Sequence, residues 1–212
     1  LAMRYIAESA KKYGIFTSLV MPHLYADAQV ESLYGNMIRI VADTGTGGWW
    51  HCSAQDKGKS YRTWPNCMNM FEINHSLLRQ FGPENWTLYK GKHLLSFVDN
   101  HDVTRVASIL TNKNHLPLIY ALAFGMPGIP CVYYGSEWGA EGRKEDGDPA
   151  LRPSFEKPEW NDLTEWISKL AEAKKQSKAL QYGNFISKVL TNGQCVFERE
   201  WEGERVYVAI NA

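Results

Sequence analysis

Short apolar runs recur along the first two-thirds of the chain, each bounded by glycine, proline or polar residues. Such runs, rich in β-branched side chains, predict strands that are buried on both faces. The four runs span residues 14–21, 36–43, 92–100 and 128–135.

Segments with apolar residues at helical spacing separate these predicted strands. In the first segment, Met3, Ile6 and Ala10 fall on one helical face, and Gly14 follows as a stop signal. The same pattern predicts helices over residues 1–13, 24–35, 70–81, 116–125 and 161–177. Strands that alternate with helices imply right-handed βαβ crossovers and a parallel sheet.

The end of the chain has a different pattern. The segments NFISKVL, QCVFEREWE and RVYVAINA are separated by Asn192-Gly193 and Glu202-Gly203, which is typical of antiparallel hairpins. We therefore expect an α/β fold with a partial (β/α)8 TIM barrel of about four βα units over residues 1–180. The start of a truncated antiparallel β domain, residues 181–212, would follow it. Because about four units cannot close a barrel, exposed sheet edges predict self-association.

Composition narrows the class of partner. Lysine plus arginine equals aspartate plus glutamate, at 23 each, so no net charge would attract nucleic acid or an anionic membrane. No apolar run approaches the roughly 20 residues that cross a bilayer. Aromatic residues reach 13%, and the flat apolar faces of sugars stack on aromatic rings. An uncharged carbohydrate therefore fits the zero net charge and the aromatic content better than a nucleic acid or an anionic membrane does.

The cysteines and histidines show no metal-binding spacing. Cys52, Cys67, Cys131 and Cys195 lie far apart, which predicts free thiols, with Cys131 buried in an apolar run. A disulfide between Cys52 and Cys67 stays open for a secreted protein. No signal peptide is visible, which favours a cytoplasmic location, although a start at Leu-Ala-Met is not typical of a native chain and secretion stays open. No metal site and no cofactor are expected.

The segment SFVDNHDVTR holds the most informative polar residues. Asn100, His101 and Asp102 follow a predicted buried strand, and in a parallel α/β barrel the carboxyl ends of the strands form the active-site face. Glycoside cleavage passes through an oxocarbenium-like state, which a carboxylate stabilises while Asn and His bind sugar hydroxyls. The alternative is that Asp102 is the N-cap of a helix over VTRVASIL.

Three ordered segments, FVDNHD, MPGIPCVYYGSEWG and KEDGDPALRP, resemble the alpha-amylase family of glycoside hydrolases. The resemblance runs from about Met70 to the end and includes the small β-sandwich that follows the barrel in that family. It implies hydrolysis of α-linked glucans or maltooligosaccharides with retention. It also implies that Asp102 is the carboxylate that distorts the sugar and stabilises the transition state, while His101 and Asn100 bind the substrate. Trp138 is a further substrate-binding candidate. Some family members hold calcium near residues 143–148, but nothing in this sequence fixes such a site.

The sequence departs from the family at the other two catalytic positions. The family carries its nucleophile in Gly-x-Arg-x-Asp and a glutamate acid/base on the next strand, and neither is recognisable here. Arg39 and Asp43 are four residues apart instead of two. Because double displacement needs both carboxylates, one alternative is a carbohydrate-binding chain or inactive barrel that does not cleave its ligand.

The first seventy residues are similar to another retaining barrel family, the alpha-galactosidases. The similarity rests on MPHLYADAQVESLYGNMIRIVADTGTGGWW and WPNCMN. It implies that Arg39 binds substrate and that Asp43 is an acid/base, although Asp43 as a capping or loop-ordering residue stays open. If both resemblances hold, pieces of two barrels join near residues 69–71, so the chain would be a chimera. An active alpha-galactosidase-like hydrolase and an engineered half-barrel are the corresponding alternatives.

Overall fold

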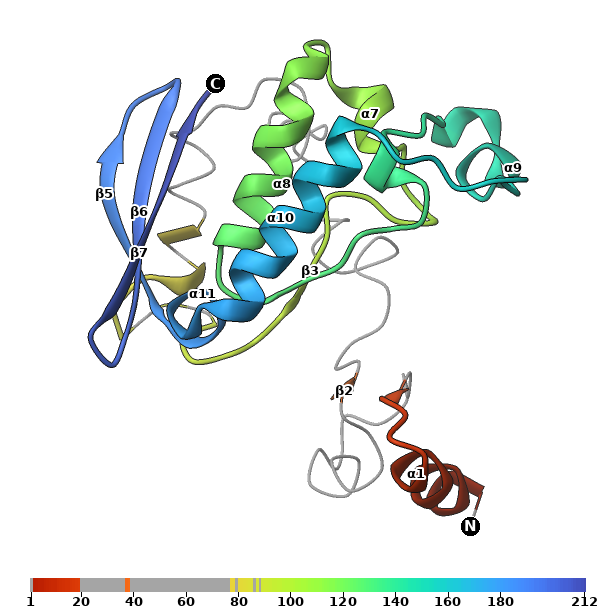
Figure 1. Ribbon diagram of the computed structural model, residues 1–212, viewed down its shortest axis with the longest axis horizontal. Helices are drawn as coiled ribbons and strands as arrows, with labels where there is room; N and C mark the ends of the chain where they lie inside the picture. Colours follow the sequence, from red (N-terminus) through yellow and green to blue (C-terminus); the bar gives the residue numbers. More distant parts are fainter. Residues whose placement is uncertain (1, 20–36, 39–76, 79, 86, 88) are drawn as a thin grey trace. The chain divides into compact units, whose positions relative to one another are not determined.

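The computed structural model describes residues 2–19, 37–38, 77–78, 80–85, 87 and 89–212 (Figure 1). The chain divides into two compact units, Leu1–Ser60 and Tyr61–Ala212. The predicted helix over residues 24–35 lies outside the described residues. No helix in the described part is both long and apolar enough to cross a membrane.

The first unit contains a helix and a parallel strand pair. Helix α1, Ala2–Lys12, follows the predicted span, and it ends where Gly14 adopts a φ of 65° that favours glycine. Strand β1, Ser18–Leu19, pairs in parallel with β2, Met37–Ile38. The parallel pairing predicted for this unit is confirmed.

The second unit contains a βαβ arrangement. Strand β3, Leu95–Ser96, and strand β4, Ile129–Pro130, pair in parallel, and helix α8, Leu116–Gly125, lies between them in the sequence. Helix α10, Asp162–Gln176, packs against α8 (Figure 1). The predicted spans of α8 and α10 are confirmed, and the four described helical positions at 77–81 lie inside the helix predicted for 70–81.

Strands β3 and β4 were predicted to be buried on both faces, and this prediction is wrong for one of the two faces. Leu95, Phe97 and Ile129 are 40%, 49% and 46% exposed. The alternate residues Val98 and Val132 pack against the cluster that contains Tyr120 of α8 and Ile167 of α10. Parallel strands are buried only where helices cover both faces, and the described residues cover one.

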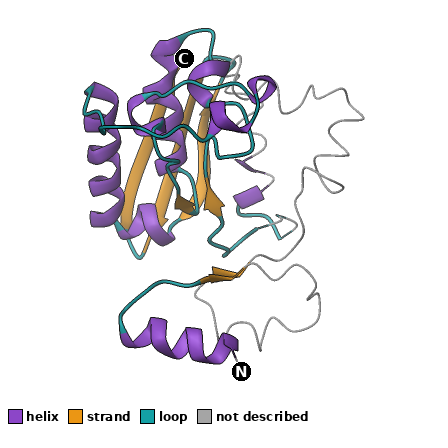
Figure 2. Cartoon of the chain, turned by 90° about the vertical axis from the view of Figure 1, so that its right-hand side faces the viewer, coloured by secondary structure: helices purple, strands orange, loops and turns teal. Residues whose placement is uncertain are grey.

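The end of the chain forms a three-stranded antiparallel sheet (Figure 2). Its strands match the predicted segments closely: β5 is Asn184–Leu190, β6 is Gln194–Trp201 and β7 is Glu204–Asn211. Glu202 and Gly203, with φ of 48° and 91°, make the tight turn between β6 and β7. The hairpin prediction is confirmed.

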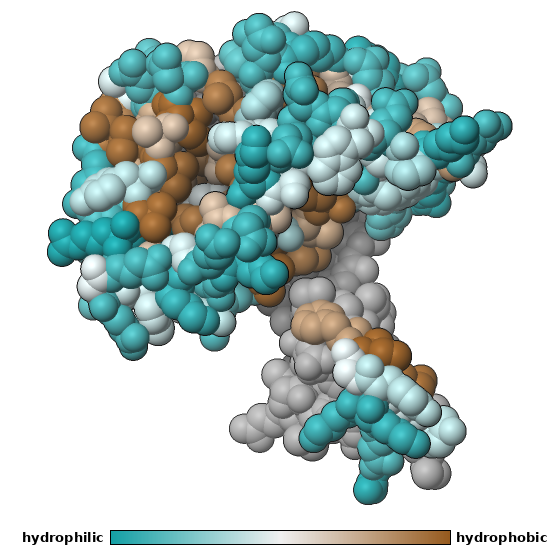
Figure 3. All heavy atoms as spheres, in the orientation of Figure 1, coloured by the Kyte–Doolittle hydropathy of each residue, from teal (hydrophilic) through white to brown (hydrophobic). Residues whose placement is uncertain are grey.

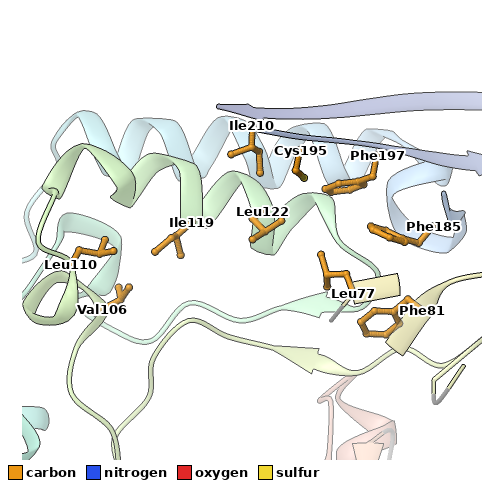
Figure 4. Packing of buried hydrophobic residues seen from close by; sticks show 10 residues of the cluster. All are labelled: Leu77, Phe81, Val106, Leu110, Ile119, Leu122, Phe185, Cys195, Phe197 and Ile210. Atoms are coloured by element: carbon orange, nitrogen blue, oxygen red, sulfur yellow. The ribbon is translucent and has the colours of Figure 1, made fainter. Parts of the chain in front are cut away.

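The sheet shares a hydrophobic core with α8 (Figure 4). Phe185, Phe197 and Ile210 from the sheet meet Ile119 and Leu122 from the helix, and all five are at most 4% exposed. Figure 3 shows apolar residues gathered where the sheet adjoins α8, whereas the surface of α10 is mainly hydrophilic. The predicted domain boundary near residue 180 stays a prediction.

Short helices lie in the segments that connect the longer helices and the strands. They are α7, Val106–Ile109; η1, Lys113–His115; η2, Ser136–Trp138; η3, Lys144–Asp146; α9, Asp148–Leu151; and α11, Lys178–Tyr182.

Candidate functional site

Asn100, His101 and Asp102 lie just beyond the carboxyl end of β3, as the sequence predicted. The Asn100 side-chain oxygen accepts a hydrogen bond of 2.8 Å from the Asp102 backbone amide, which fixes a tight turn. The His101 and Asp102 side chains are 56% and 54% exposed. Both are therefore accessible to a ligand.

A cation from a distant segment faces Asp102. Nη2 of Arg152 is 3.0 Å from one Asp102 carboxylate oxygen, and Nε2 of His101 is 3.2 Å from the other. Arg152 Nη1 is also 3.3 Å from Asp148. A hydrogen bond from Lys144 and the charge of Arg152 lower the pKa of Asp148. These pairs join exposed side chains, so each of them adds little to stability.

The alternative reading of Asp102 as a helix N-cap is wrong. Helix α7 begins at Val106, whose backbone amide donates a hydrogen bond of 2.9 Å to Asp99. Asp99 supplies the acceptor because it is buried below the turn, whereas Asp102 points to solvent. The Asp102 carboxylate is thus not used by the helix.

A buried polar network supports this turn. Asp99, Arg105 and Ser136 are each at most 1% exposed. Ser136 Oγ donates to the Asp99 carboxylate at 2.8 Å, and Arg105 donates to Ser136 Oγ at 2.9 Å. Burial raises the pKa of Asp99, while the hydrogen bonds from Val106 and Ser136 and the charge of Arg105 oppose that rise. The network joins the end of β3 to the segment after β4.

Trp138 lies beside the ion-pair cluster. Trp138 lines a shallow hollow together with Tyr134, Phe155 and Arg152. The rings of Trp138 and Phe155 meet edge-on, with 5.1 Å between their centres. Because Arg152 also contacts Asp102, the hollow adjoins the candidate site. The role of Trp138 in binding substrate stays a prediction.

The structure describes only some of the other residues that the sequence singled out. Arg39 and Asp43 lie outside the described residues, so the acid/base assignment to Asp43 stays a prediction. Cys131 and Cys195 are free thiols, as predicted. Cys131 is exposed, not buried as expected, because it lies on the uncovered side of the β3–β4 pair. Within the described part of the chain, no three His, Cys, Asp or Glu side chains cluster as metal ligands would.

Sequence reasoning missed Arg152 and the buried Arg105. Arg152 ends DPALR, within a segment that carried the resemblance, whereas Arg105 stands three residues after Asp102, beyond the end of FVDNHD. The sequence gives no sign of the contact between Arg152 and Asp102, because the two residues are 50 positions apart.

Comparison with known proteins defines the family. Residues 53–184 match the model of the alpha amylase catalytic domain, so the chain belongs to the alpha-amylase family. This match runs across residues 69–71, where a junction between two barrels was predicted, and begins before Met70.

The chain is similar to curated cyclomaltodextrin glucanotransferases and to a curated alpha-amylase. It is 32% identical over 117 residues to a cyclomaltodextrin glucanotransferase of Niallia circulans, which covers 55% of this chain and 16% of that protein. An alpha-amylase of Niallia circulans is 30% identical over 125 residues, covering 58% of this chain and 23% of that protein. The match therefore spans less than a quarter of either relative.

Solved structures agree in fold. An alpha-amylase of Anoxybacillus aligns with 99% of this chain and 45% of its own, with a TM-score of 0.63 and 21% identity. The alpha-amylase of Geobacillus thermoleovorans, complexed with acarbose, aligns over the same shares with a TM-score of 0.61 and 17% identity. At these identities the likeness concerns the fold alone.

Proposed function

We propose that this chain contributes to the glucan-binding and transition-state-stabilising part of a retaining glycoside hydrolase site. The observation that carries the proposal is the placement of Asp102 and His101, both accessible, beyond the carboxyl end of a parallel strand in a chain of the alpha-amylase family. The barrel part proposed for this chain comprises about four βα units, supported by two parallel strand pairs.

The charges around Asp102 suit a stabilising carboxylate better than a nucleophile. A retaining pair requires a second carboxyl group about 5 Å away, with space between them for the sugar. The acidic neighbour within the ion-pair cluster is Asp148, and the guanidinium of Arg152 bridges the two carboxylates. Asp102 is therefore assigned to the electrostatic stabilisation of an oxocarbenium-like sugar and to binding its hydroxyls.

The surrounding groups define the class of substrate. Asp102 accepts hydrogen bonds, Arg152 donates them, and His101 does either according to its protonation, so together they suit the hydroxyls of an uncharged sugar. Trp138 and Phe155 add aromatic surface beside them. An α-linked glucan or maltooligosaccharide has both the hydroxyls and the apolar faces that such a surface binds.

Resolving the products from maltoheptaose and from a nitrophenyl α-galactoside tests this proposal. We expect the protein to bind or cleave the maltooligosaccharide, and Asp102→Asn to remove cleavage and weaken binding. Glu172→Gln, which neutralises an exposed carboxylate on α10, is the matched control and should leave both unchanged. Cleavage of maltoheptaose that survives Asp102→Asn would refute the assigned role.

Two other outcomes identify the alternatives. Binding of maltoheptaose without products supports a carbohydrate-binding chain that lacks the double-displacement pair. Cleavage of the galactoside alone supports a site based on Asp43.

A further inference from the structure

The backbone carbonyl of Leu151 accepts two hydrogen bonds from residues that are distant in the sequence. Nη2 of Arg105 donates to it at 3.0 Å, and the Tyr133 hydroxyl donates to it at 3.3 Å. The Leu151 side chain is fully buried, and the next residue in the chain is Arg152. These two donors therefore anchor the carbonyl that precedes Arg152, while the Arg152 backbone amide donates to the Asp148 carbonyl at 2.9 Å.

Arg105 is itself held from several sides. Its side chain has no exposed surface, its guanidinium carbon lies 4.2 Å from the centre of the Tyr133 ring, and Nη1 donates to the Tyr134 carbonyl at 2.7 Å. A planar guanidinium satisfies several acceptors in a fixed fork geometry, which an ammonium does not. Arg105 and Tyr133 thus act as one rigid support beneath Leu151.

The Arg152 side chain needs such a support. It is 44% exposed, and besides its two ion pairs Nε donates a long hydrogen bond of 3.3 Å to the His101 carbonyl. Ion pairs between exposed side chains contribute about 0–1 kcal/mol, too little to hold a long side chain in one orientation. Its contacts with Asp102 and Asp148 therefore depend on where the backbone places its Cα atom. A shift of the Leu151 carbonyl would move the guanidinium away from both carboxylates.

We propose that Arg105 and Tyr133 are positioning residues for the glucan site, which act by fixing the Leu151 carbonyl and so holding Arg152 against Asp102. This inference rests on the proposed function for its effect on ligand binding. It also makes a prediction about Arg152 that needs no ligand.

Two substitutions separate this role from a structural one. Tyr133→Phe keeps the ring beneath Arg105 and removes only the hydroxyl that reaches Leu151. Arg105→Lys keeps the positive charge and removes the fork, and if this variant fails to fold, Tyr133→Phe still decides the question. Tyr207→Phe, on the exposed side of β7, is the matched control for loss of a tyrosine hydroxyl.

The first readout is the NMR signal of the Arg152 Nε–H group, assigned with Arg152→Lys. We expect Tyr133→Phe and Arg105→Lys to shift this signal and speed its exchange with water, and Tyr207→Phe to leave it unchanged. An Arg152 signal that is the same in Tyr133→Phe as in the unaltered protein would overturn the proposal, whether or not glucan binds.

The second readout is a double-mutant cycle on the Kd for maltoheptaose. We expect Tyr133→Phe to weaken binding roughly 3- to 10-fold, the effect of one hydrogen bond, and to add nothing when Arg152→Ala is already present. Effects that multiply in the double variant would show that Tyr133 does not act through Arg152. Failure of the unaltered protein to bind maltoheptaose would refute the proposed function, while the NMR readout would still decide the positioning role.

Discussion

Two buried cations lie at the carboxyl end of α8. Lys174 Nζ donates to the carbonyls of Phe124 and Met126 at 2.9 and 3.1 Å, and Arg199 donates to the Gly125 carbonyl at 2.7 Å. The last carbonyls of a helix have no partner within the helix and carry partial negative charge. These two side chains satisfy those carbonyls without a carboxylate and tie α10 and β6 to the end of α8.

Lys174 makes stability depend on pH. Burial, with a contribution from Arg199, lowers the pKa of Lys174 from 10.5 to about 7 in the folded protein. Because the unfolded chain binds this proton more tightly, the free energy of unfolding should rise with pH between about 7 and 10, by at most ~1.4 kcal/mol per pH unit. The free energy of unfolding, measured with urea at pH 7 and pH 9, should rise with pH in the unaltered protein. In Lys174→Met this rise should be lost. An equal slope in both proteins would contradict the assignment.

At the scale of elements, the start of α10 also supports the segment that carries Trp138. The Asn161 side-chain oxygen accepts from the Thr164 amide at 3.1 Å, and Thr164 Oγ1 accepts from the Asn161 amide at 3.4 Å, which makes a capping box. The Asn161 side-chain amide donates to the Trp138 carbonyl at 3.0 Å. The cap therefore fixes both the helix start and η2.

Asn161→Ala should lower the free energy of unfolding by about 1 kcal/mol, the typical effect of losing an N-cap. Asn161→Asp keeps the acceptor for Thr164 and loses the donor to Trp138, so we expect a smaller loss. Thermal unfolding of the three proteins measures this order. Equal losses in the two variants would show that the cap contributes nothing of its own.

The elements whose spans the sequence predicted correctly are those marked by local sequence patterns. The spans of α8 and β5–β7 follow from periodicity, from Gly125 and from the turn at Glu202-Gly203. The strands β3 and β4 were expected to be longer and buried, because their apolar runs do not reveal which neighbours cover them. In the site, the motif located Asp102, whereas Arg152 and Arg105 depend on contacts between distant segments that no local pattern encodes.

At the scale of the whole molecule, the β3–β4 pair presents an apolar surface that the described residues do not cover. Leu95, Phe97 and Ile129 lie on it, and nothing among the described residues covers them. Large exposed apolar surfaces and unpaired strand edges favour association with another chain.

We therefore predict that the protein self-associates. Light scattering during size-exclusion chromatography should give a mass above the 24.2 kDa of one chain, increasing with concentration. Phe97→Lys should shift the distribution toward the monomer, and Trp160→Lys, at an exposed position in the loop before α10, should not. A monomer at every concentration would contradict this account.

The most direct test of the central claim is a crystal structure of the protein with maltoheptaose at saturating concentration. We predict a glucosyl unit within hydrogen-bond distance of the Asp102 carboxylate and the His101 ring, with Arg152 still beside Asp102. A sugar bound only elsewhere, or no bound sugar, would contradict the assignment of a glucan site to this end of β3.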